Sequence, residues 1–182
     1  MSLMTMAAPP SLASRLDLCK CMKMCLIHDM PESLVGDLTP ADGVPKTEKS
    51  RRESTTMDYI TQQLLGNVRG AATNVGEDIR AIWQEHEDSE TLESRFVQDI
   101  DKVELLLQMV EYEKRGEGKV NLSEFTYVAT KVSLPEIKPW VEEILKEREE
   151  FWSRKELVHG EAKEESDALS DMKKLQDKYY DD

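Results

Sequence analysis

Residues His28–Glu53 read HDMPESLVGDLTPADGVPKTEKSRRE, and this stretch decides how the rest of the sequence is interpreted. It opens with an adjacent histidine and aspartate, and it ends in a charged segment with helical periodicity. Between them, residues 36–45 contain two glycines and two prolines, which is typical of a structured loop. Because that loop is short, we expect Glu32 and Asp37 to lie near the His-Asp pair.

The segment before this stretch predicts an amphipathic helix. Ser11 or Ser14 can cap its start, and Asp17 follows Ser14 by three residues, as in a capping box. The apolar side chains that recur at helical spacing are Leu18, Met22, Cys25 and Leu26. This pattern places His28 and Asp29 on or beside the buried face. Proline at position 31 predicts that the helix ends or restarts there.

Helical periodicity also continues after the loop. The predicted helices cover residues 46–65, 77–87, 91–113, 122–132 and 135–152. In the clearest of them, one apolar stripe consists of Phe96, Ile100, Val103, Leu107 and Val110. Asp101 lies at the edge of that buried side. No alternation typical of strands persists, so the sequence predicts an all-α helical bundle.

The domain organisation follows from composition along the chain. We expect a disordered N-terminus over residues 1–10 and one helical domain over residues 11–152. Residues 153–182 are rich in charge and poor in apolar side chains, so they predict an acidic tail that is helical or disordered.

Composition excludes several classes of function. The 182 residues carry 37 acidic and 24 basic side chains, a net charge of −13. This argues against a nucleic acid polymer as partner, because phosphate binding needs clustered cations. The three cysteines crowd one segment and cannot form a disulfide framework, so we expect an intracellular protein of the cytoplasm or nucleus. No apolar run approaches the roughly 18 residues that a membrane span needs.

An imidazole beside several carboxylates offers the ligands that divalent ions such as Mn, Co, Mg or Zn accept. Taken alone, His28 is also typical of a histidine satisfied at a helix end. Two further metal motifs are weaker. Cys21, Cys25 and His28 share a helical face as a zinc triplet would, although such cysteines are commonly core residues. Residues 113–124 imitate a calcium loop, but Arg115 stands where an oxygen ligand belongs.

A second stretch, FVQDIDKVELLLQMVEYE from Phe96 to Glu113, joins His28–Glu53 in a specific pattern. Together they resemble the HD-domain 5′-deoxynucleotidases, in particular the HD domain-containing protein 2 group, over residues 18–152. The resemblance implies an HD-domain helical bundle and a homodimer. It also implies a hydrolase that removes the 5′-phosphate from deoxyribonucleoside 5′-monophosphates with a divalent cation, Mn, Co or Mg.

The resemblance also implies which residues form the site. The metal ligands that it implies are His28, Asp29, Glu32, Asp37, the main-chain oxygen of Leu38, and Asp101. The His-Asp pair and Asp101 would hold the catalytic ion, and the others would serve a second metal or the substrate's surroundings. As catalytic residues, Glu32 or Asp37 would orient the attacking water or pass a proton to the leaving oxygen.

Lysines and arginines cluster at the start of the helix after the loop. Lys46 and Lys49, with the arginines at 51 and 52, form the densest basic cluster of this acidic chain, and we expect the two lysines to meet the substrate phosphate. The alternative is a solvated helix start in which these cations pair with Glu48 and Glu53.

The sequence departs from the family pattern in one respect. The family carries an Arg-Trp element and a Ser-Asp-His motif upstream of the HD pair, and that histidine binds metal. Here only 27 residues precede His28 and none is histidine. His86 and His159 lie in charged stretches expected to be exposed, so we do not expect either to substitute. The interpretation is therefore an N-terminally truncated HD domain with weak or absent activity. The alternative function is a catalytically inactive HD-fold protein that acts through protein–protein association.

Overall fold

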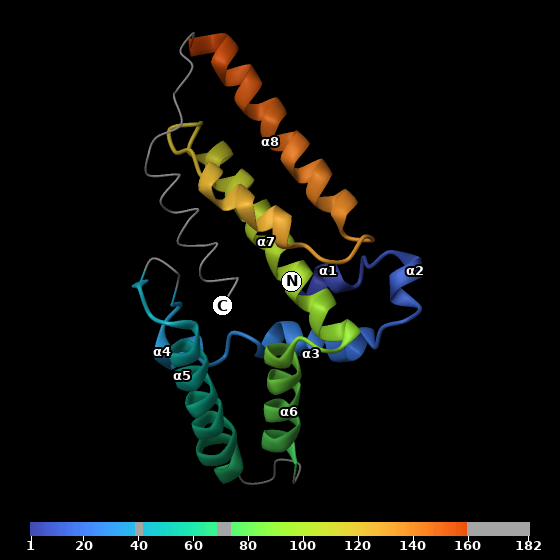
Figure 1. Ribbon diagram of the computed structural model, residues 1–182, viewed down its shortest axis with the longest axis vertical. Helices are drawn as coiled ribbons and strands as arrows, with labels where there is room; N and C mark the ends of the chain where they lie inside the picture. Colours follow the sequence, from blue (N-terminus) through green and yellow to red (C-terminus); the bar gives the residue numbers. More distant parts are fainter. Residues whose placement is uncertain (39–41, 69–73, 160–182) are drawn as a thin grey trace.

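The computed structural model describes residues 1–38, 42–68 and 74–159, the last five of these through the backbone only. Every regular element in those ranges is helical, so the all-α prediction is confirmed (Figure 1). The α-helices are α1 (Ser2–Thr5), α2 (Pro10–Ala13), α3 (Leu18–Ile27), α4 (Glu32–Val35), α5 (Lys46–Asp58), α6 (Val75–Asp88), α7 (Leu92–Arg115) and α8 (Lys138–His159). A π-helical segment, η2 (Tyr59–Leu64), continues α5, and the 3-10 segments are η3 (Leu65–Asn67) and η4 (Ser123–Lys131).

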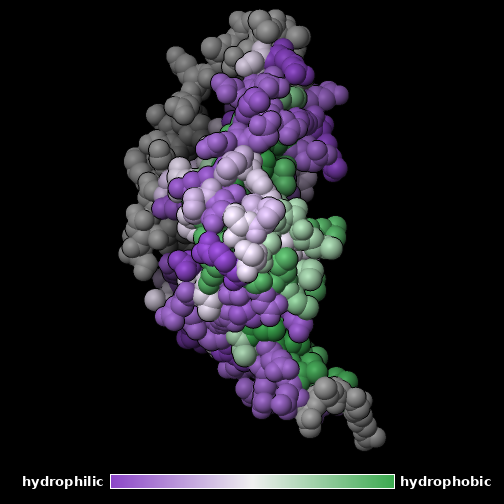
Figure 2. All heavy atoms as spheres, turned by 90° about the vertical axis from the view of Figure 1, so that its right-hand side faces the viewer, coloured by the Kyte–Doolittle hydropathy of each residue, from purple (hydrophilic) through white to green (hydrophobic). Residues whose placement is uncertain are grey.

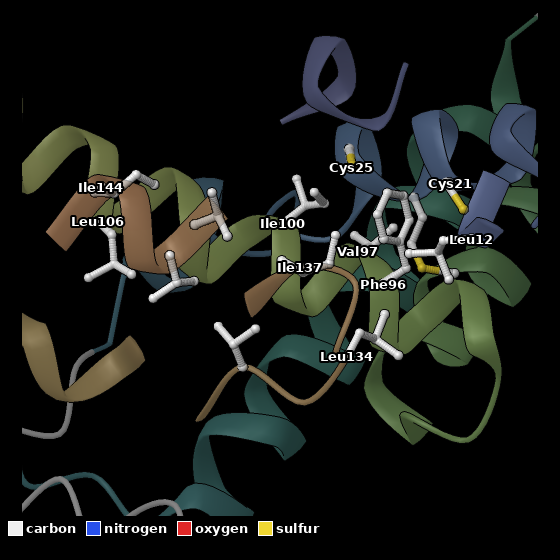
Figure 3. Packing of buried hydrophobic residues seen from close by; sticks show 14 of the residues in the cluster. Leu12, Cys21, Cys25, Phe96, Val97, Ile100, Leu106, Leu134, Ile137 and Ile144 are labelled. Atoms are coloured by element: carbon white, nitrogen blue, oxygen red, sulfur yellow. The ribbon is translucent and has the colours of Figure 1, made fainter. Parts of the chain in front are cut away.

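Helix α7 organises the bundle, because it packs against α3, α6, α8 and η4. Its buried face begins as predicted, with Phe96 and Ile100 in the main core (Figure 3). The prediction for Leu107 is wrong: it is 41% exposed, and Leu106 is buried instead. The partners of α7 change along its length: α3 and α6 contact its first half through His28–Asp101 and His86–Gln98, and α8 contacts its end through Arg148–Glu113. The buried face therefore takes in Leu106 and Met109 beside the predicted Val110.

Helix α3 carries the His-Asp pair at its C-terminal end. Its N-cap is Asp17, whose side chain accepts a hydrogen bond from the Lys20 N–H at 3.0 Å, so the predicted serine cap is wrong. Leu26 was expected on the buried face but is 72% exposed. The residues that α3 buries are Cys21, Met24, Cys25 and Ile27.

The N-terminal residues differ from the expected disordered segment. Ser2–Thr5 form α1, which packs against α3. Thr5 is fully buried, and its hydroxyl donates to the Ser2 carbonyl at 2.8 Å. Apolar contacts of Met1 and Met4 with the main core explain why this segment is ordered. At the other end, α8 continues past position 152 to His159. Most of the predicted acidic tail, residues 160–182, lies outside the described residues.

A smaller apolar cluster joins the helices around the His-Asp pair. Its buried members are Ile27 of α3, Met57 and Ile60 of the α5–η2 helix, and Trp83 of α6. Close approach of α6 to η2 depends on Gly76, because a Cβ there would lie 2.4 Å from the Thr61 carbonyl oxygen. This packing fixes α6 beside the end of α3.

One buried carboxylate of α7 anchors the segment that leads into α8. Asp99 is almost fully buried. It accepts hydrogen bonds from the Leu134 N–H at 2.7 Å and from the Ser133 N–H and hydroxyl, and it pairs with Lys102 at 3.4 Å. Because its oxygens satisfy backbone donors at a turn, its role is structural.

A second buried carboxylate, Glu113, joins the far end of α7 to α8. It accepts two hydrogen bonds from the Arg148 guanidinium, both at 2.9 Å, one from Trp152 Nε1 at 2.9 Å and one from the Leu122 N–H at 2.7 Å. All its oxygen capacity is directed to these groups. The calcium-loop interpretation of residues 113–124, in which Glu113 is the first ligand, does not fit this arrangement.

Candidate functional site

His28 lies where α3 ends and is held by main-chain atoms. Its Nδ1 is 3.1 Å from the Cys25 carbonyl oxygen, one turn earlier in the helix. Its own carbonyl accepts a hydrogen bond from Trp83 Nε1 at 3.2 Å. The side chain is buried, and Nε2 has no hydrogen bond of acceptable geometry among the described residues. This leaves Nε2 as the ring atom that faces the site.

Two carboxylates lie beside that nitrogen. Asp29 Oδ2 is 3.0 Å from His28 Nε2, and Asp101 Oδ1 of α7 is 3.8 Å from it. The predicted meeting of the His-Asp pair with the distant aspartate is therefore observed in the geometry. Both aspartates remain about half exposed, 61% for Asp29 and 51% for Asp101, so each side chain can rotate.

These charges control the protonation of the imidazole. Burial lowers the pKa of His28, but the adjacent carboxylates of Asp101 and Asp29 outweigh it and raise the pKa to about 10. For Asp29, burial raises the pKa, and the contacts with His28 reverse this and leave it lowered. The site thus concentrates negative charge around one buried ring and favours a cation.

Glu32 and Lys49 form the next layer of the site. Glu32 starts α4, and burial together with the charges of Asp29 and Asp37 raises its pKa to about 7. Lys49 Nζ, on α5, lies 3.8 Å from Glu32 Oε1 and 3.6 Å from Glu53 Oε1, and it donates to the Leu38 carbonyl at 3.0 Å. Lys49 therefore joins the loop after α4 to α5.

The remaining predicted residues are less closely integrated. Asp37 is exposed and reaches the site through its charge on Glu32. Lys46 is exposed at the first position of α5, and no hydrogen bond or ion pair among the described residues joins it to the site. At the same helix start, Glu48 accepts from Arg51 and Arg52 at 2.8 Å, as the alternative of a solvated, paired helix start expected.

Sequence reasoning missed His86, which was expected to be exposed. Its side chain is only 12% exposed, and its ring lies edge-on to that of His28 with centroids 5.2 Å apart. Both ring nitrogens are buried without a hydrogen-bond partner among the described residues. A signal was present: His86 follows Trp83 by three residues and so shares the inward face of α6. His159 has no described side chain.

The donor set suits a divalent cation, although the side chains do not yet converge on one. Among the described residues, no group of three His, Cys, Asp or Glu side chains stands close enough to hold an ion. A buried ring nitrogen without a partner beside two exposed carboxylates is nevertheless the chemistry that such an ion takes.

The zinc-triplet alternative receives no support. Cys21 and Cys25 belong to the main apolar core (Figure 3). Burial raises the pKa of Cys21 to about 12 and that of Cys25 to about 11, which disfavours the thiolate that binds zinc.

An adjacent His-Asp pair joined to an aspartate of a distant helix defines a class of helical proteins with a histidine-and-carboxylate site between their helices. Within that class, the chain belongs to the HD domain family, whose model matches residues 1–138. The predicted family is therefore confirmed.

Two curated relatives of the chain are both named 5′-deoxynucleotidases. The chain is 44% identical over 135 residues to 5′-deoxynucleotidase hdd1 of Schizosaccharomyces pombe. The matched region covers 74% of this chain and 66% of that protein. It is 38% identical over 135 residues to 5′-deoxynucleotidase HDDC2 of Homo sapiens, covering 74% and 63%. The solved structure of HD domain-containing protein YGK1 matches with a TM-score of 0.65 at 32% identity, over 84% of this chain and 74% of that one.

The matches span only part of these relatives. Three curated relatives from yeasts are covered over 66%, 60% and 58% of their lengths, which is less than two thirds. Within the described part of the chain, no helix is both long and apolar enough to cross a membrane.

Proposed function

We propose that the protein is a divalent-metal-dependent phosphohydrolase that removes the 5′-phosphate of deoxyribonucleoside 5′-monophosphates. The observation that carries the proposal is the position of His28 Nε2, 3.0 Å from Asp29 Oδ2 and 3.8 Å from Asp101 Oδ1. The names of the relatives, 5′-deoxynucleotidases, supply the substrate class.

His28, Asp29 and Asp101 are the proposed ligands of the catalytic cation. When bound, such a cation polarises a phosphoryl oxygen and lowers the pKa of a water ligand to near neutrality. The fixed ring of His28 sets the position of the ligand set, and the two aspartates balance the positive charge. The proposed ion is Mn, Co or Mg: Mn and Co accept mixed nitrogen and oxygen ligands, and Mg accepts the carboxylate oxygens.

Glu32 is the proposed general acid or base. A carboxyl group with a pKa of about 7 holds or releases a proton near neutral pH, which suits transfer to a departing 5′ oxygen or from an attacking water. Asp37, which contributes to that raised pKa, is its proposed partner in catalysis. With the main-chain oxygen of Leu38, these two carboxylates are also proposed to receive a second metal or the substrate's immediate surroundings.

Lys49 is the stronger of the two proposed phosphate-binding residues. Its ammonium group already lies among Glu32, Glu53 and the Leu38 carbonyl, so it neutralises charge where an anionic substrate would enter. Lys46 stands one turn earlier on α5 and is exposed. We further propose a homodimer located in the cytoplasm or nucleus.

A direct assay tests this function. The purified chain is titrated with Mn²⁺, Co²⁺ and Mg²⁺, and phosphate release is followed from dAMP and dCMP, with AMP as the ribonucleotide control. Release that needs the ion and is lost in both Asp29→Ala and Asp101→Ala supports the proposal. Release that survives both substitutions overturns the site.

One observation favours the alternative of an inactive HD-fold protein that acts by association. Hydrophobic residues reach the surface on the face drawn in Figure 2. Large apolar side chains are also exposed on α1, directly after it and on α3; they are Leu3, Met6 and Leu26. Such side chains suit a protein partner or a second copy of the chain. Normal ion binding without phosphate release, together with a larger mass in solution that Leu26→Ser abolishes, would favour this alternative.

A further inference from the structure

We propose that His86 is a second imidazole ligand of the cation that His28, Asp29 and Asp101 hold. This inference rests on the metal site of the proposed function and adds a fourth side chain to it, from α6. The feature that carries it is a pair of edge-on imidazoles with unpaired, buried nitrogens at the end of α3.

The ring nitrogens of His86 lack partners. Nδ1 and Nε2 are both buried, and neither makes a hydrogen bond among the described residues. His28 Nε2 is also buried, and it lies 3.0 Å from Asp29 Oδ2 without the geometry of a hydrogen bond. Burying an imidazole nitrogen without a partner is unfavourable, because the lost hydration is not replaced. Two such nitrogens on His86, with His28 Nε2 buried in the same ring contact, indicate that a group from solution belongs between the rings.

The spacing of the rings fits one shared ion. Two imidazoles that each bind an ion at about 2.1 Å, at an angle of about 90–110°, place their ring centroids about 5 Å apart. The observed separation of His28 and His86 is 5.2 Å with an interplanar angle of 61°. Pairs of rings that only pack in a core also adopt this distance, but their nitrogens then find other partners.

The helix that carries His86 is fixed relative to His28. Trp83, one turn before His86, donates from Nε1 to the His28 carbonyl at 3.2 Å. On the other side, Gln98 Nε2 of α7 donates to the His86 carbonyl at 3.0 Å. These contacts hold the two rings in register without using any ring nitrogen of His86.

A carboxylate lies beside the Nδ1 of His86. Glu87 Oε1 is 3.5 Å from it, a position from which a small movement makes the carboxylate–histidine contact that orients metal-binding imidazoles. With Nδ1 directed to Glu87, Nε2 is the nitrogen of His86 that would bind the ion. Two imidazoles with two carboxylates favour Co²⁺, Zn²⁺ or Mn²⁺ over Mg²⁺, which prefers oxygen ligands alone.

The first test measures ion binding without turnover. Co²⁺ is titrated into the wild-type chain, His86→Gln, Asp101→Asn and His159→Gln, with calorimetry and visible absorption as readouts. We expect the affinity of His86→Gln to fall about 10 to 100-fold and its cobalt spectrum to change. His159→Gln is the matched control, since it removes an imidazole from the end of α8, far from α6 (Figure 1), and should bind as wild type does.

A second measurement does not depend on the folding of a variant. Imidazole ¹⁵N spectra of the wild-type chain with and without Zn²⁺ should show one ring nitrogen of His86 and Nε2 of His28 shifting together. If Asp101→Asn loses the ion while His86→Gln keeps wild-type affinity and spectrum, or if the His86 resonances do not respond, the inference fails and the site of the proposed function stands. If the wild-type chain binds no ion at all, both fail.

Discussion

Asp99 and Asp101 lie two residues apart on α7 and have different surroundings. Asp99 is buried and binds the Ser133 and Leu134 amides, whereas Asp101 is half exposed and faces His28 Nε2 at 3.8 Å. One helix thus presents a structural carboxylate and a candidate ligand on different faces.

This pair offers a matched comparison. Asp99→Asn should lower the free energy of unfolding by about 1.5–3 kcal/mol, because charge-assisted hydrogen bonds to buried amides weaken. Asp101→Asn should leave stability within about 0.5 kcal/mol, because the group is exposed, yet it should abolish ion binding. Urea unfolding and Co²⁺ calorimetry check both expectations; a loss of ion binding in Asp99→Asn while the protein remains folded would contradict the division of roles.

Lys49 contacts residues of the candidate site, whereas Lys46 is exposed on the same helix. Lys49→Gln should reduce kcat/KM for dCMP at least about tenfold, because it removes the cation that joins the Leu38 carbonyl to Glu32 and Glu53. Lys46→Gln, at an exposed position of α5, should change it less than about twofold. Steady-state kinetics of both variants decide the matter. Equal reductions of kcat/KM in the two variants would mean that the overall positive charge of α5, and not the position of Lys49, affects the reaction.

Glu113 stabilises the contact of α7 with α8. Glu113→Gln should cost about 3 kcal/mol, since it leaves the mostly buried Arg148 guanidinium without its carboxylate. Glu111→Gln is the control, because its ion pair with Arg115 is exposed and worth less than about 0.5 kcal/mol. The measurement is the midpoint and slope of urea unfolding. Similar losses in the two variants would contradict the role given to Glu113.

The Lys20–Glu85 pair links α3 to α6 and should make stability depend on pH. The hydrogen bond to Glu85 raises the pKa of Lys20; burial raises that of Glu85, but hydrogen bonds from Lys20 and Thr91 outweigh it and leave the pKa lowered. The contribution of Glu85 is present above its unfolded pKa of about 4.3 and is lost as pH falls through its lower folded pKa. That of Lys20 is present below about pH 10.4 and is lost above it.

Lys20→Met should therefore lower stability by about 0.5–1 kcal/mol between pH 5 and pH 9, and by less as the pH falls through the lowered folded pKa of Glu85. Lys23→Met, at an exposed lysine of the same helix, is the control. Thermal unfolding across this range gives the profile. A loss that stays constant down to pH 3 would show that packing of the Lys20 stem, and not its charge, is responsible.

The three cysteines should react unequally. Cys19 is exposed, while burial raises the pKa of Cys21 to about 12 and of Cys25 to about 11. Iodoacetamide at pH 8 should alkylate Cys19 alone in the folded chain and all three after unfolding, as read by mass spectrometry. Equal alkylation in the folded chain would mean that α3 is open to solvent.

Periodicity predicted the helices well, and it placed His28 and Asp101 each at the edge of a long apolar stripe. That the two residues meet was implied by the family resemblance and not by periodicity. It failed at Leu107, where the stripe is right for an isolated helix but the packing partner changes along α7. The predicted cap of α3 was also wrong, because Asp17 and not Ser11 or Ser14 accepts the hydrogen bond from the first turn.

The candidate site was only partly predictable for a similar reason. His86 stands in the charged sequence EHEDSE, whose composition predicts exposure. Its burial depends on the approach of α6 to α3 and η2, made by Trp83 and Gly76, which lie outside that local window. Short-range composition therefore misjudged a residue that long-range packing buries.

The imidazole of His28 is oriented by the carbonyl oxygen of residue 25, and its own peptide group is held by the indole of residue 83. A peptide oxygen is supplied by any amino acid, so position 25 is free to vary among small apolar residues without disturbing the ring. An indole N–H has no substitute of similar shape. The geometry of His28 therefore depends on a tryptophan of another helix. Substitutions in this protein should be tolerated at position 25 and not at position 83.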